Sequence, residues 1–205
     1  MRKGKTSKRD QQKAILENQE VLAAELTYLG QTAFQTNEDR QRVAQFFFIS
    51  FGSFLAAILS LQIETVSQND IFLILGFVFL FVTLFGISTL LQLTRLRLAW
   101  LESVLAMNRL KAHIQEAHSP ALDDVFAWLD VPAAYKPGSV GYYQAIQVAL
   151  GTGVALGAAA AFFMLVLQVG LSLGSVVLLG IALGMMAASM LFNRLYRKAL
   201  DARRP

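Results

Sequence analysis

The chain of 205 residues contains no cysteine, which excludes disulfides, thiolate metal sites and thiol catalysis. Charge is also scarce, because Asp, Glu, Lys and Arg make up only 16% of the residues while hydrophobic residues make up 55%. No charged residue and no histidine lies in three apolar stretches, residues 43–63, 71–94 and 137–193. Proton relays, ion-coupled transporters and voltage sensors place ionisable groups at membrane depth, so their absence argues against these classes.

Each apolar stretch is long enough to cross a membrane. A hydrocarbon core about 30 Å thick requires about 20 helical residues, and residues 137–193 suffice for two crossings joined by a Gly/Ser turn. We therefore predict an all-α integral membrane protein with four transmembrane helices in two antiparallel hairpins. A cytoplasmic N-terminal helix and a cytoplasmic extension of the second transmembrane helix complete the predicted fold. The first apolar stretch begins too late for a cleavable signal peptide, so we expect none.

The positions of lysine and arginine indicate the orientation. All of them lie in three segments outside the apolar stretches: Arg2, Lys3, Lys5, Lys8, Arg9, Lys13, Arg40 and Arg42; Arg95, Arg97, Arg109, Lys111 and Lys136; and Arg194, Arg197, Lys198, Arg203 and Arg204. Short loops rich in Lys and Arg are retained in the cytoplasm. Both termini and the central loop are therefore predicted to be cytoplasmic, in a plasma or inner membrane.

The chain divides into nine predicted segments, two of them on the outer side. In chain order they are a basic start and amphipathic helix (1–42), the first span (43–63), a short outer loop (64–70), the second span (71–94), a cytoplasmic helical extension with a short helix and a loop (95–141), the third span (142–168), an outer turn (169–174), the fourth span (175–193) and a basic tail (194–205). The string Thr36-Asn37-Glu38-Asp39 indicates a helix break or kink before the first span, with one continuous helix as the alternative. No Gly or Pro interrupts the second span and its extension, so one helix from Ile71 to about Gln115 is expected.

Two heptad-like seams approach the same side of the membrane. Apolar residues recur at steps of three and four in both cytoplasmic segments, at Leu22, Leu26 and Leu29 and at Leu98, Leu101 and Leu105. Such stripes pack against another helix, so these six leucines are the predicted cytoplasmic contact residues. The pairing can form within one chain or between subunits.

The last two spans contain a small residue at every fourth position. The sets are Gly153, Gly157 and Ala161 in the third span and Gly180, Gly184 and Ala188 in the fourth. Such spacing gives a flat face through which membrane helices approach closely. Contact between the two spans is one interpretation, and contact with a second subunit is the other. The Phe-rich second span lacks such a stripe and is expected to face lipid over much of its surface.

Candidate chemistry is confined to the cytoplasmic segments. His113 and Glu116 share a helix face, but His118 lies near the expected helix end and no third ligand has a defined spacing. The carboxylates Asp123, Asp124 and Asp130 accompany no phosphate-binding glycine loop, and capping of a helix from Ser119 to about Leu129 explains the first pair. We therefore predict no catalytic residue, no metal and no cofactor. The cations are dispersed rather than interleaved with aromatics, so no nucleic-acid partner is expected.

These patterns predict a non-enzymatic multi-pass membrane protein that assembles, or recruits a partner, through its cytoplasmic helices. Its expected partners are the lipid bilayer and either further copies of the chain or a cytoplasmic protein. The alternative is an oligomeric pore or effector that dissipates ion gradients. The layout of membrane helices with a cytoplasmic helical extension resembles that of small membrane effectors of bacterial conflict systems such as SLATT-type proteins, and this resemblance of layout implies the second function.

Overall fold

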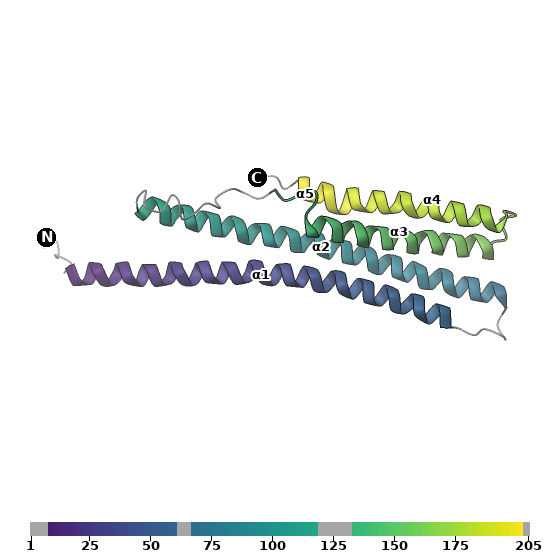
Figure 1. Cartoon of the computed structure of the whole chain (residues 1–205), viewed down its shortest axis with the longest axis horizontal. Coiled ribbons are helices and arrows are strands. Elements are labelled where there is room, and N and C mark those ends of the chain that lie inside the picture. Colours follow the sequence, from purple (N-terminus) through teal and green to yellow (C-terminus); the bar gives the residue numbers. More distant parts are fainter. Residues whose placement is uncertain (1–7, 61–66, 119–132, 203–205) are drawn as a thin grey trace, which may run out of the picture. The chain divides into compact units, whose positions relative to one another are not determined.

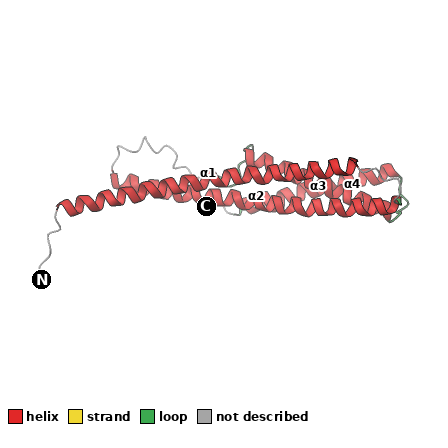
Figure 2. Cartoon of the chain, turned by 90° about the horizontal axis from the view of Figure 1, so that it is seen from below, coloured by secondary structure: helices red, strands yellow, loops and turns green. Residues whose placement is uncertain are grey.

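The computed structural model describes residues 8–60, 67–118 and 133–202, and within these ranges every regular element is a helix (Figure 2). Figure 1 follows the elements along the chain. They are α1 (Lys8–Ser60), α2 (Gln68–His118), α3 (Val140–Val166), α4 (Leu173–Leu191), the π-helical turn η2 (Phe192–Arg197) and the short α5 (Lys198–Asp201). The predicted all-α class is confirmed.

Four of these helices are long and apolar enough to cross a membrane. The 51 residues of α2 extend for about 76 Å at 1.5 Å per residue, more than twice a bilayer core of about 30 Å. The expected continuous helix from Ile71 to about Gln115 is thus present and slightly longer at both ends. The helix expected from Ser119 to about Leu129 lies outside the described residues.

The predicted break between Thr36 and Asp39 is wrong, because α1 continues through these residues and the alternative of one helix holds. The Thr36 hydroxyl donates to the Thr32 carbonyl one turn earlier, 2.8 Å away, instead of capping a new helix. Glu38 and Asp39 pair with Arg42 at distances of 3.5 and 3.9 Å. The side chains that could have capped a new helix therefore support the existing one.

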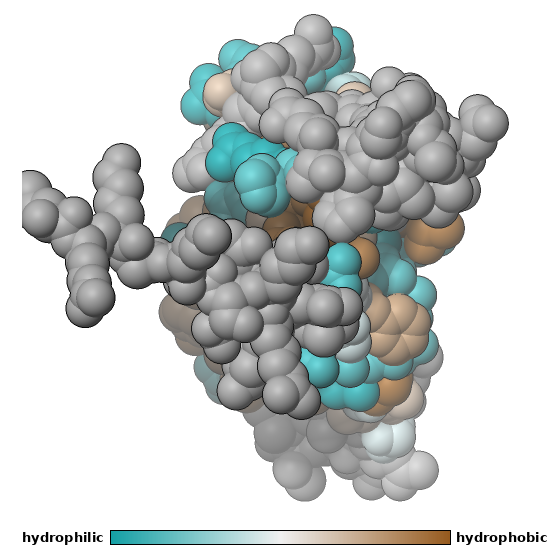
Figure 3. All heavy atoms as spheres, turned by 90° about the vertical axis from the view of Figure 1, so that its left-hand side faces the viewer, coloured by the Kyte–Doolittle hydropathy of each residue, from teal (hydrophilic) through white to brown (hydrophobic). Residues whose placement is uncertain are grey.

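The chain forms two compact units. The first combines Met1–Asn37 with Ala99–Pro132, and the second combines Glu38–Leu98 with Ala133–Pro205. Both α1 and α2 contribute one portion to each unit. The boundaries between the units, after Asn37 and after Leu98, lie within a few residues of the predicted start of the first span and the predicted end of the second. The face of the molecule in Figure 3 shows hydrophilic side chains interspersed with hydrophobic ones.

In the second unit α2 packs against α1, α3 and η2. A core cluster joins Phe79 and Val82 of α2 to Ala155 and Ala159 of α3, and the Phe79 ring stacks on Phe162 at 5.7 Å. Among the phenylalanines expected to face lipid, Phe77 and Phe81 do remain 58% and 59% exposed, but Phe79 is 8% exposed. Phe79 is therefore packed inside the second unit, whereas Phe77 and Phe81 are exposed on its surface.

Capping residues delimit the last two membrane-length helices. Ser139 is the N-cap of α3 and its hydroxyl accepts the Tyr142 backbone N–H at 3.3 Å. Ser172 caps α4 in the same way. Between the two helices, Gly170 has φ of 71°, a left-handed conformation that glycine adopts without strain. The helices begin within two residues of the predicted third and fourth spans.

Candidate functional site

The glycines of α3 and α4 bring the two helix backbones into contact. A Cβ added at Gly184 would lie 2.6 Å from the Gly153 carbonyl oxygen, and one added at Gly180 would lie 2.8 Å from the Gly157 carbonyl oxygen. Because the residue numbers rise along one helix as they fall along the other, α3 and α4 are antiparallel (Figure 1). A side chain at any of these positions would push the helices apart.

The remaining two members of the small-residue sets lie at the same interface. The Ala188 Cβ is 2.8 Å from the position of a Cβ at Gly153, and the Ala161 Cβ is 3.2 Å from that at Gly180. The structure therefore brings together all six residues predicted for membrane packing: Gly153, Gly157, Ala161, Gly180, Gly184 and Ala188. They lie within one chain, between α3 and α4.

The predicted cytoplasmic leucines divide between the two units. Five belong to the first unit, namely Leu22, Leu26, Leu29, Leu101 and Leu105, whereas Leu98 is the last residue of an α2 portion in the second. Leu101 is 4% exposed and the other five leucines are half-buried. Ala33, eleven residues after Leu22 on α1, is also buried. The leucine seam of α1 thus coincides with the buried side of that helix.

Large apolar side chains lie off this seam. Val21, Tyr28 and Phe34 of α1 are 67%, 63% and 66% exposed. At 100° per residue, Val21 and Tyr28 are rotated by about 120° from the centre of the leucine seam, and Phe34 by a similar angle on its other flank. The first unit therefore presents apolar surface that its own seam does not cover.

Two buried arginines in the second unit form a cluster that the sequence did not reveal. Arg97 of α2 is 7% exposed, and its guanidinium donates to the Ala134 carbonyl at 3.1 Å and to the Ala133 carbonyl at 3.2 Å. These bonds fix the start of the segment that leads into α3 against α2. Arg40 of α1 is 9% exposed, and its Nη1 would lie 2.8 Å from a Cβ added at Gly141. Glycine at the first turn of α3 thus makes room for the arginine.

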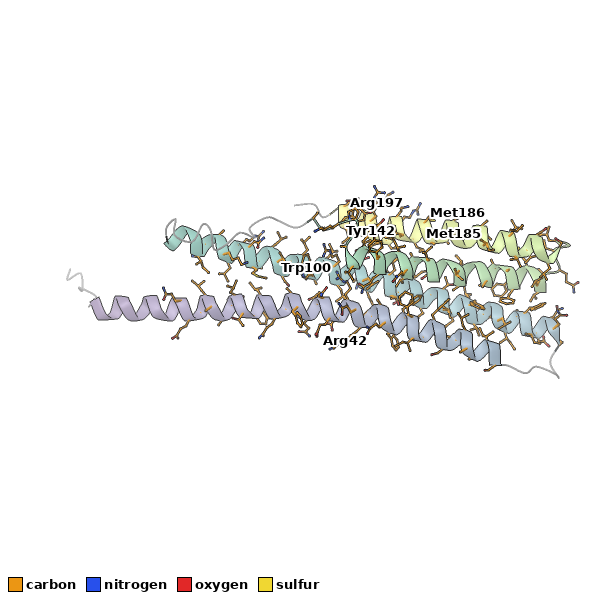
Figure 4. All side chains as sticks on the ribbon, viewed as in Figure 1. Arg42, Trp100, Tyr142, Met185, Met186 and Arg197 are labelled. Atoms are coloured by element: carbon orange, nitrogen blue, oxygen red, sulfur yellow. The ribbon has the colours of Figure 1, made fainter. Side chains whose placement is uncertain are left out.

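One aromatic side chain, Tyr196, neighbours both arginines and belongs to a series of ring contacts. Tyr196 is 3% exposed, is an electrostatic neighbour of both arginines, and stacks on Phe192 at 5.5 Å. Phe192 contacts Tyr142 edge to face at 5.6 Å, and Tyr142 contacts Tyr135 at 6.1 Å. The Arg197 guanidinium lies over the Tyr135 ring, 5.7 Å from its centre. Figure 4 shows Tyr142 and Arg197 near each other, where α3 begins and α4 has ended.

The surroundings of Tyr135 shift its pKa in both directions. Burial raises the pKa of Tyr135, and the neighbouring Tyr142 and Asp201 raise it further, while the positive charge of Arg197 lowers it. The hydroxyl therefore stays protonated at neutral pH and acts as a hydrogen-bonding group. Nothing in this arrangement supplies a nucleophile with an adjacent base.

The π-helical turn is tied to α2 by a hydroxyl. The Thr94 Oγ1 lies 2.9 Å from the Leu90 carbonyl oxygen and 3.0 Å from the Leu195 carbonyl oxygen. A π turn widens the helix and redirects carbonyls from their ordinary partners. The single hydrogen of the Thr94 hydroxyl is shared between these two carbonyls, so the side chain links η2 to α2. Together with Arg97, it joins the middle of α2 to the segment before α3 and to the turn after α4, which lie at the same end of the antiparallel pair.

Candidate metal ligands do not assemble in the described ranges 8–60, 67–118 and 133–202, where no group of three His, Cys, Asp or Glu residues could hold a metal ion. His113 lies exposed on α2. The carboxylates Asp123, Asp124 and Asp130 lie outside the described residues, and so do the side chains of Glu116 and His118.

The arginine–tyrosine cluster was missed because Arg40 and Arg97 were interpreted only as topology signals. Their partners lie far along the chain, and no spacing rule links them. The available signal was the position of each arginine, three residues beyond the end of a predicted span. In comparisons with protein-family models, curated proteins and solved structures, no match to this chain was found.

Proposed function

We propose that this chain is a non-enzymatic, four-span membrane protein that assembles, or recruits a partner, through a cytoplasmic helical unit. In this proposal the first unit lies in the cytoplasm with both termini, and the second unit is the membrane bundle. Four helices of membrane length support the membrane location. All Lys and Arg lie in the N-terminal segment, the central segment and the C-terminal tail, and none lies in the two predicted outer loops. This distribution supports the orientation.

The observation that carries the proposal is the exposed apolar surface of α1 in the first unit. Val21, Tyr28 and Phe34 stay largely exposed although the leucine seam of the same helix is turned toward its own unit. Val21 and Tyr28 lie on one flank of α1 and Phe34 on the other, and in the proposed cytoplasmic location all three face water, which favours association with a partner that covers them. Because tyrosine and phenylalanine are enriched in protein interfaces, these side chains suit a second helix of the same chain or of another protein.

Mutations can distinguish the role of the exposed apolar side chains of α1 from that of the leucine seam. Replacing Leu26 and Leu101 with Asp introduces charge at the seam and should disrupt the first unit while membrane insertion is retained. Replacing Val21 and Tyr28 with Gln should leave that unit folded and abolish assembly or partner recovery. Glu25→Gln, at an exposed polar position between them, is the matched control.

The measurement is subunit number in detergent by light scattering, combined with identification of co-purifying proteins. Circular dichroism reports whether the first unit stays helical. The proposal fails if the Val21/Tyr28 variant keeps the wild-type subunit number and recovers the same proteins as Glu25→Gln. Vesicle flotation of each variant separates a defect of insertion from a defect of assembly.

The pore remains the alternative function, and three buried threonines of the second unit give it little support. Thr83, Thr89 and Thr152 are buried, and each donates to a carbonyl of its own helix four residues earlier, at 2.8, 3.0 and 2.7 Å. Such bonds satisfy the hydroxyl locally and leave no donor for a water column. Dye leakage from liposomes containing the purified protein would favour the pore over assembly through α1.

A further inference from the structure

An apolar groove runs along α3 and α4 in the second unit. Its volume is about 560 Å³, and Phe72 of α2 contributes to its lining. Small residues of the α3–α4 interface, including Gly157 and Gly180, form its floor, and larger side chains such as Val177 and Ile181 of α4 form its rim. Every lining residue is nonpolar. The groove therefore selects for an apolar occupant.

The dimensions distinguish between two apolar occupants. The lining residues on α3 extend from Leu150 to Leu165, a rise of about 22 Å, so a volume of 560 Å³ corresponds to a mean cross-section of about 25 Å². A helix with side chains, about 10–12 Å wide, has a cross-section of roughly 80–110 Å². One hydrocarbon chain, whose carbon atoms pack about 4 Å from their neighbours, requires on the order of 20 Å². The groove matches a single chain.

The lining residues show which end of the groove lies near the turn between α3 and α4. Phe72, Leu165 and Leu173 lie at the helix ends beside the turn between α3 and α4, whereas Leu150 and Met185 lie near the middles of α3 and α4. In the proposed topology this turn faces the outside. The groove then begins at the outer surface and ends beyond the bilayer centre, within reach of an acyl chain of the outer leaflet.

The charges near the outer end favour one kind of headgroup. Asp70 lies in the first turn of α2, at the same end of the helix as Phe72, and its carboxylate accepts the Ser67 hydroxyl at 2.6 Å. The sequence has no Lys or Arg from residue 43 to residue 94 or from residue 137 to residue 193. A carboxylate without a neighbouring cation attracts an ammonium group and repels a net negative headgroup.

We propose that this groove binds one acyl chain of a zwitterionic phospholipid from the outer leaflet. The inference rests on the proposed membrane insertion, and it adds a specific lipid site on the α3–α4 pair. The lipid's ammonium group lies at the outer end of the bundle, where Asp70 supplies a negative charge, and its acyl chain follows the floor of small residues.

Photolabelling tests the site in the full-length protein. Vesicles contain phosphatidylcholine with a diazirine on one acyl chain, and the labelled peptides are mapped by mass spectrometry. Val177→Phe with Ile181→Phe fills the groove, while Leu178→Phe with Met186→Phe places the same bulk on exposed α4 residues that do not line it. We expect labelling of α3 and α4 lining residues to fall by about fivefold or more in the first variant and to stay at the wild-type level in the second.

Three results would overturn the inference. The first is equal labelling in wild type and both double variants. The second is competition by phosphatidylglycerol as effective as that by phosphatidylcholine with the same chains. The third is oxidative dimerisation of the Ile181→Cys variant but not of the Leu178→Cys variant, which would show a second copy in the groove. Because the chain has no other cysteine, any disulfide must form through the introduced residue. Vesicle flotation precedes each assay, so that failed insertion, which contradicts the proposed function itself, is distinguished from failed lipid binding.

Discussion

The contact between α3 and α4 predicts a large effect from the smallest possible side chain. A Cβ added at Gly157 would collide with the Gly180 carbonyl oxygen and would lie 3.1 Å from the Gly180 carbonyl carbon and 3.3 Å from the Gly184 Cα. All three neighbours are backbone atoms, which cannot rotate away. The Gly157→Ala variant must therefore separate the helices.

The cost can be estimated from that separation. Carbon atoms prefer separations of about 3.5–4.0 Å. Separation of the helices by a further 0.5–1 Å would lose about a quarter to a half of the attraction energy of each atom pair elsewhere along the interface. Overpacking costs about 1–3 kcal/mol, and a collision with rigid backbone belongs at the upper end. Alanine recovers about 1 kcal/mol through its higher helix propensity. We expect the free energy of unfolding to fall by about 2 kcal/mol.

The assay is reversible unfolding in mixed micelles with increasing dodecyl sulfate, followed by far-ultraviolet circular dichroism. Gly52→Ala is the matched control, because a Cβ at Gly52 of α1 meets nothing within 4 Å. That substitution should leave stability unchanged or raise it by up to about 1 kcal/mol. If Gly157→Ala proves as stable as Gly52→Ala, the backbone contact is not what holds α3 against α4.

Two further predictions concern the links between α2 and the α3–α4 pair. Arg97→Gln removes charge-assisted bonds to the Ala133 and Ala134 carbonyls and should lower the free energy of unfolding by about 1.5–3 kcal/mol in the same assay, whereas Arg95→Gln, at an exposed position, should leave it unchanged. Thr94→Val removes the hydroxyl near the Leu195 carbonyl and should cost about 0.5–1.5 kcal/mol. An equal loss in Thr83→Val, whose hydroxyl donates only within its own helix, would contradict the proposed link to η2.

The parts of the fold that depend on local composition could be predicted. An uncharged apolar stretch determines a membrane-length helix by itself, so α3 and α4 begin within two residues of the predicted spans. The spacing of Gly153, Gly157, Gly180 and Gly184 also indicated a face for close packing. The spacing could not choose between a helix of the same chain and a second subunit, because both would present the same flat surface.

The parts that depend on distant partners could not be predicted. Thr36 has the side chain of a helix cap, and only the continuing helix shows that its hydroxyl donates to Thr32 instead. Arg97 finds its carbonyl partners 36 and 37 residues later, and Thr94 finds one 101 residues later. No periodicity links such positions. The buried arginines therefore looked like ordinary positive charges at the ends of spans.

The contacts of Thr94 and Arg97 also impose an order on biogenesis. At synthesis rates of about 5–20 residues per second, the Leu195 carbonyl is made about 5–20 s after Thr94. During that interval the Thr94 hydroxyl lacks the Leu195 carbonyl, because this residue has not yet been synthesised. Nascent chains that end before Ala133 lack both carbonyl partners of Arg97, so its guanidinium should then depend on water or lipid headgroups.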